Sequence, residues 1–61
     1  MKEVATKNAT MMIGDWLMEE IWWDGTGLEQ VGNHMYYLPV GEELMRIYTD
    51  KNERVIEIEK V

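Results

Sequence analysis

Glycine and proline break this chain into segments that are short for helices. They stand at positions 14, 25, 27, 32, 39 and 41, and the segments after residue 27 are rich in β-branched and aromatic residues. Short strands separated by turn signals about every 8–12 residues are typical of small all-β domains. The spacing therefore predicts a compact antiparallel β fold, with one stretch, residues 11–23, whose secondary structure is ambiguous.

Four strands are expected after residue 27, over residues 28–31, 34–38, 44–49 and 54–61. Gly32-Asn33 has the composition of a two-residue hairpin loop that tolerates positive φ. Pro39 is expected to end its strand or mark an edge, and residues 50–53 form a polar turn. In the last strand Val55, Glu57 and Glu59 are expected to point away from Ile56 and Ile58, because strand side chains alternate.

Residues 10–23 allow two interpretations. As a strand, residues 16–23 alternate, although each face then carries one glutamate, Glu19 or Glu20. As a helix, the segment could start at a Thr10 cap, but Gly14 inside it would cost about 1 kcal/mol. We favour the strand, which gives a mostly β, five-stranded antiparallel SH3-like barrel or meander. The alternative is an α+β fold with residues 10–23 helical across a four-stranded sheet.

The chain is expected to form one small domain over residues 1–61, with residues 1–10 as a frayed start or a short edge strand. The segment Met12-Ile13-Gly14-Asp15-Trp16-Leu17, with a later hairpin, resembles the opening of small uncharacterised bacterial and phage proteins with an SH3-like barrel. The resemblance implies that this segment forms the first turn and strand. It implies no reaction.

The charge distribution points to the kind of partner. The net charge is −6, and no lysine or arginine occurs between Asn8 and Met45, where all three tryptophans lie. Direct binding of nucleic acid or of anionic membranes needs basic side chains, so neither is expected. A basic protein surface or self-association is favoured. The chain has no cysteine and one histidine, so no metal or cofactor site is expected, and a cytoplasmic location fits.

No residue pattern predicts catalysis. His34 has no orienting carboxylate near it in sequence and is expected to be an exposed strand residue. Glu19 or Glu20 is expected to pair with Arg46 or Arg54 on a neighbouring strand. In each pair Trp22-Trp23 and Tyr36-Tyr37, one ring should face the core and the other the solvent.

The sequence therefore predicts a non-enzymatic, acidic protein-binding module, such as an adaptor or an inhibitor that docks on a basic protein surface. The candidate contact residues combine carboxylates with aromatic rings and are Asp15, Trp16, Glu19, Glu20, Trp22, Trp23, Asp24, Tyr36 and Tyr37. The alternative is a structural homo-oligomer that buries its aromatic and methionine surface between copies.

Overall fold

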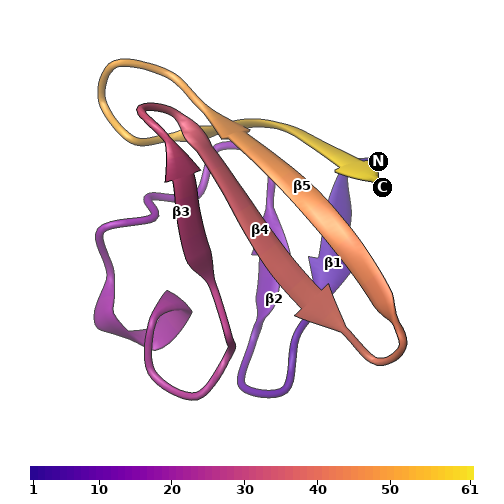
Figure 1. Cartoon of the computed structure of the whole chain (residues 1–61). Helices are drawn as coiled ribbons and strands as arrows, with labels where there is room; N and C mark the ends of the chain where they lie inside the picture. Colours follow the sequence, from indigo (N-terminus) through magenta and orange to yellow (C-terminus); the bar gives the residue numbers. More distant parts are fainter.

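The computed structural model describes all residues, 1–61, as two antiparallel sheets joined by an irregular segment (Figure 1). In chain order the elements are β1 (Glu3–Ala5), β2 (Thr10–Met12), the one-turn 3-10 helix η1 (Glu20–Trp22), β3 (Glu29–Gly32), β4 (Met35–Val40), β5 (Glu43–Thr49) and β6 (Val55–Lys60). β1 and β2 form a hairpin, and β3-β4-β5-β6 form a four-stranded meander. None of the elements is a helix long and apolar enough to cross a membrane.

The prediction of a mostly β fold is confirmed. Instead of the five-stranded barrel or meander expected, the structure has a four-stranded meander and a separate two-stranded hairpin, and the meander does not close, because β3 and β6 lie at opposite ends of the strand order. The first ten residues contain β1, so they form the short strand that was one of the two expectations for them.

Residues 16–23 form neither the strand that we favoured nor the alternative helix. Trp16 makes one isolated β-bridge, to Arg54, and the chain then passes through turns into η1. Only Leu17 and Trp22 of this stretch are buried. Their spacing fits neither strand nor helix periodicity. An irregular backbone buries both side chains while it leaves Glu19 and Glu20 in solvent, which a regular strand across the core could not do.

The core lies between the meander and the β1–β2 hairpin, which Figure 1 shows behind the sheet. The register sets Tyr36 opposite Ile47 and Ile47 opposite Ile58, so these side chains share the inner face. Eleven buried hydrophobic residues form a single cluster: Val4, Met11, Leu17, Trp22, Leu28, Tyr36, Leu38, Met45, Ile47, Val55 and Ile58.

Two irregularities in the meander correct details of the sequence prediction. The register between β5 and β6 shifts at Tyr48/Thr49. Val55 and Ile58 are therefore both buried while Ile56 is exposed, so the simple alternation expected for β6 is wrong. A second shift, between Gln30 and Gly32, lies next to the β3–β4 loop.

The β3–β4 loop consists of residues 33–34, one position later than expected, because Gly32 still pairs with Met35. Neither Gly32 nor Asn33 has positive φ. The bulge beside the loop offers a reason, since bulges add the local twist that primed turns otherwise supply. Pro39 does not end β4. Pro39 lies beyond Tyr37, the last residue of β4 that pairs with β3. On the β3 side its missing N–H therefore breaks no hydrogen bond of the sheet.

Candidate functional site

Residues 15–24 form an irregular loop that we call the aromatic–acidic loop. Backbone hydrogen bonds attach its start to the beginning of β6: Leu17 N–H donates to the Glu53 carbonyl (3.0 Å) and Val55 N–H to the Asp15 carbonyl (2.9 Å). Gly14 precedes the loop with φ +97°, a conformation that L-residues with side chains avoid. The loop is therefore joined firmly to the meander at its first residues.

Two apolar side chains fix the loop against the core. Leu17 is fully buried and Trp22 is nearly so. The Thr26 hydroxyl donates a hydrogen bond to the Trp22 carbonyl, which ties the end of η1 to the following turn. Trp22 is a core residue, as is Tyr36, so both drop out of the predicted contact surface. The expectation that each aromatic pair splits between core and surface is correct for the tryptophans, and Tyr36 and Tyr37 also lie on opposite faces of the sheet.

Trp16 and Trp23 are the exposed aromatic residues of the loop, with 43% and 39% of their surface accessible. The Trp23 indole N–H donates to the Leu17 carbonyl (2.9 Å). Its ring also meets the Tyr36 ring edge to face, with centroids 5.7 Å apart. These two contacts fix the orientation of the Trp23 ring, so its accessible part is held in one position.

The carboxylates of the loop differ in what they already bind. Asp15 accepts a hydrogen bond from the Met12 backbone N–H (2.8 Å) and so serves the local turn. Glu19, Glu20 and Asp24 are exposed and belong to none of the three ion pairs in the structure. The loop therefore carries three carboxylates without ion-pair partners in the same segment as the two exposed tryptophans.

The predicted pairing of Glu19 or Glu20 with Arg46 or Arg54 is wrong. Arg46 donates from Nη1 to Glu59 (2.8 Å) on the neighbouring strand β6. The Arg54 guanidinium instead lies over the Trp16 ring, 5.9 Å from its centroid. The pairing failed because the loop does not enter the sheet as a strand, so its glutamates have no cross-strand neighbour.

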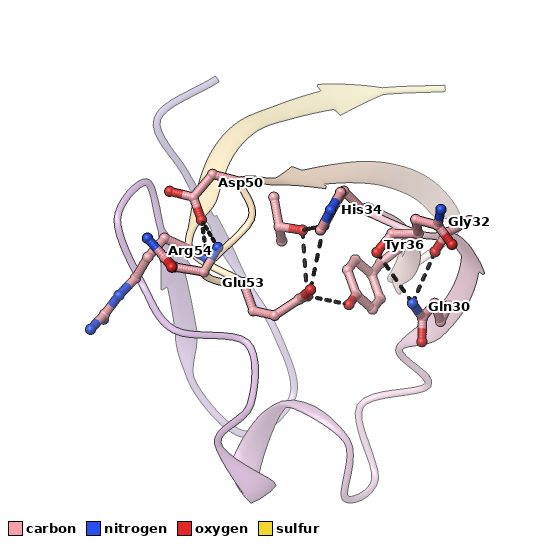
Figure 2. Close-up of polar contacts among 10 residues, drawn as sticks. Gln30, Gly32, His34, Tyr36, Asp50, Glu53 and Arg54 are labelled. Atoms are coloured by element: carbon pink, nitrogen blue, oxygen red, sulfur yellow. Dashed lines mark hydrogen bonds and ion pairs between the residues drawn. The ribbon is translucent and has the colours of Figure 1, made fainter.

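A polar cluster centred on Glu53 supports the loop from the β5–β6 turn (Figure 2). The Tyr36 hydroxyl donates to Glu53 Oε2 (2.5 Å), and His34 Nδ1 lies 3.3 Å from Oε1. The Thr49 hydroxyl, buried nearby, donates to the same carboxylate at 3.5 Å. Burial, followed by the hydrogen bond to Glu53, raises the pKa of Tyr36 to about 12.

Through this cluster, Glu53 and Trp23 are linked by two chains of contacts, one through Tyr36 and one through Leu17. Trp23 touches Tyr36 and bonds to Leu17, while both Tyr36 and Leu17 bond to Glu53. Glu53 itself has φ +62° and is the only residue other than glycine with a positive φ. At this strained position the Glu53 carboxylate accepts the hydrogen bond of Tyr36, whose ring contacts Trp23.

Sequence reasoning missed the Glu53 cluster. His34 was expected to be an exposed strand residue; it lies in the β3–β4 loop, about half exposed, with Glu53 as partner. The sequence did contain one indication of a tight turn at this place, because Asp50 occupies the first position of the polar turn. Its carboxylate accepts the backbone N–H groups of Arg54 (3.0 Å) and Asn52 (2.8 Å), which lower its pKa. Such a turn brings the residues around it close to the neighbouring hairpin loop.

Tyr37 lies on the other face of the meander from Tyr36, apart from the aromatic–acidic loop. Arg46 covers its ring, with the guanidinium carbon 5.8 Å from the centroid. The same arginine and the Tyr48 hydroxyl both donate to Glu59, and these hydrogen bonds, that of Tyr48 first, lower the pKa of Glu59. The structure thus divides the predicted contact residues between two surfaces.

No group of three or more His, Asp or Glu side chains is placed to hold a metal ion, and the structure has no pocket. Comparison of the chain with protein-family models, with curated proteins and with solved structures gives no match. The geometry of the chain itself therefore carries the functional interpretation.

Proposed function

We propose that this protein is a binding module, an adaptor or an inhibitor, that docks on a basic protein surface through its aromatic–acidic loop. The observation that carries the proposal is the combination of two exposed tryptophans with three carboxylates that lack ion-pair partners, all within residues 15–24.

The aromatic part of the loop is suited to supply affinity. Tryptophan is enriched among the residues that dominate binding energy in protein interfaces. Since the Trp23 ring is already fixed by Leu17 and Tyr36, docking would lose little side-chain entropy there. Burial of its exposed part against a partner would remove apolar surface from water.

The charged part of the loop is suited to supply partner selection. Glu19, Glu20 and Asp24 contribute to a net charge of −6, and they outnumber Arg54, the cation that lies over Trp16 of the loop. A net negative field attracts a positively charged partner and raises the association rate. It also repels acidic partners, so the loop discriminates by charge before the tryptophans make contact.

A titration with an oligoarginine peptide, followed by tryptophan fluorescence, tests the proposal. Binding should weaken steeply as salt is raised. The double variant Glu19→Gln/Glu20→Gln should bind more weakly than the matched control Glu42→Gln/Glu57→Gln, which removes the same charge from exposed residues outside the loop. Equal losses in the two variants, or binding that does not depend on salt, would overturn the proposal.

One observation favours a second candidate, a homo-oligomer. The outer face of the meander carries Tyr37, Leu44 and Tyr48 and has no layer of the chain over it. If this face pairs with a second copy, the melting temperature should rise with protein concentration, and Leu44→Lys should abolish the rise. A monomer by light scattering at high concentration would exclude this candidate.

A further inference from the structure

The contact between Arg54 and Trp16 follows from the backbone. The two residues face each other in an isolated antiparallel bridge, with one backbone hydrogen bond on each side, at 3.0 and 2.9 Å. Residues directly opposite each other in such a bridge project to the same side. The guanidinium is therefore delivered to the face of the indole ring, where its carbon lies 5.9 Å from the centroid.

Arg54 is unusual among the cations of the chain because an aromatic ring, and not a carboxylate, holds its side chain. The chain has twice as many acidic as basic residues, 12 against 6. Arg46 and Lys60 each pair with a glutamate, whereas Arg54 makes no ion pair. The nearby Asp50 carboxylate accepts a hydrogen bond from the backbone N–H of Arg54, and not from its guanidinium. The face of Trp16 thus holds an exposed cation that has no carboxylate partner.

Both partners of this contact remain accessible. Trp16 has 43% of its surface exposed, and Arg54 is also exposed. The Arg54 side chain makes no hydrogen bond, while the backbone bonds on either side of the bridge do not involve it. The guanidinium can leave the ring without breaking the attachment of the aromatic–acidic loop to β6.

We propose that Trp16 is a cation-binding position of the docking surface, which Arg54 occupies in the free protein and which an arginine or lysine side chain of the partner takes on docking. This inference rests on the proposed function, since it names the partner group that the aromatic–acidic loop receives. Arg54 acts as an internal competitor. It covers the Trp16 ring in the free protein and so lowers the apparent affinity for any cation that binds there.

The size of the competition follows from the strength of the contact. An exposed cation–π contact contributes about 0.5–1 kcal/mol. If the partner must displace Arg54, removal of the arginine side chain should strengthen binding about two- to fivefold, which is the same free energy expressed as a ratio of dissociation constants. The gain should persist at high salt better than a gain from net charge, because it depends on a short-range contact.

The test compares Arg54→Ala with Lys51→Ala in titrations with an oligoarginine peptide. Lys51 lies in the same β5–β6 turn, is exposed and makes no ion pair, so its removal changes the net charge equally without uncovering a ring. We expect Arg54→Ala to gain about two- to fivefold more affinity than Lys51→Ala. Adding Trp16→Leu to Arg54→Ala should abolish that difference.

The outcomes separate the inference from the proposed function. If the wild-type protein binds the peptide and the two alanine variants gain equally, Arg54 is not a competitor and the inference is overturned while the proposed function stands. The same conclusion follows if Trp16→Leu leaves the gain of Arg54→Ala intact. If neither the wild-type protein nor any variant binds the peptide, the proposed function fails and the inference fails with it.

Discussion

Replacing Glu53 by glycine changes two free-energy terms of opposite sign. The backbone at Glu53 has φ +62°, which costs an L-residue with a side chain about 1–2 kcal/mol and glycine almost nothing. Glycine also makes the unfolded chain more flexible, at a cost of about 0.4–1 kcal/mol. The backbone terms together should therefore stabilise the variant by about 0.5–1 kcal/mol.

The side-chain term acts in the other direction. Glu53 accepts a hydrogen bond of 2.5 Å from Tyr36, whose residue is only 2% exposed. Hydrogen bonds to charged groups contribute about 1.5–3 kcal/mol, and loss of the carboxylate leaves the Tyr36 hydroxyl without its partner. Glu53→Gly should therefore destabilise the wild-type protein by about 1–2 kcal/mol, the difference between the two terms.

The sign should reverse when Tyr36 is phenylalanine. In the Tyr36→Phe protein the strong hydrogen bond is already absent, and Glu53 retains only the half-exposed His34 and the long contact to Thr49. There, Glu53→Gly should be neutral or stabilising by up to about 1 kcal/mol. Urea unfolding of the four proteins measures the coupling directly. Equal destabilisation in both backgrounds would refute the role assigned to the Glu53–Tyr36 hydrogen bond.

Three further predictions concern the scaffold. In urea unfolding, Gly27→Ala should destabilise the protein by about 1–3 kcal/mol more than Gly41→Ala. Both glycines have positive φ, but only at Gly27 would an added Cβ overlap Pro39, at 2.8 Å from its Cγ. Equal losses of stability in the two variants would contradict this prediction. Because the pKa of Tyr36 is raised to about 12, stability should be full below pH 10 and fall as the pH approaches 12, and Tyr36→Phe should show a shallower fall in thermal melts. Because the pKa of Asp50 is lowered, its contribution should be present at neutral pH and lost as the pH falls below about 4; Asp50→Asn should melt with less dependence on acid pH, and an unchanged acid profile would exclude that contribution.

The regular strands of the meander could be predicted because their signals are local. Residues 34–38 and 44–49 alternate between inner and outer side chains along most of their length, and glycine-containing or polar turns separate them. The inner positions Leu38, Met45 and Ile47 are fully or almost fully buried, as this alternation requires. The acidic character of the aromatic–acidic loop is likewise a property of composition that folding cannot alter.

The candidate site was predictable only in part. Trp16, Trp23, Glu19, Glu20 and Asp24 were identified from sequence, and all five are exposed. The cluster that holds Trp23 in place was not identified, since it joins residues that are 17 positions apart, Tyr36 and Glu53, through a turn whose geometry no single segment reveals.

By itself, the sequence determined the β character of the chain, the position of most turns and the concentration of negative charge and tryptophan in one segment. These properties depend on backbone preferences and on composition, both of which act within a few residues. The tertiary structure alone decided that Trp22 is buried and Trp23 exposed, that Ile56 faces solvent, and that Arg54 meets Trp16. The last two depend on register, where a shift of one residue turns a side chain to the opposite face, and register is set by bulges and long-range packing. The division between Trp22 and Trp23 depends on how the irregular segment packs on the core.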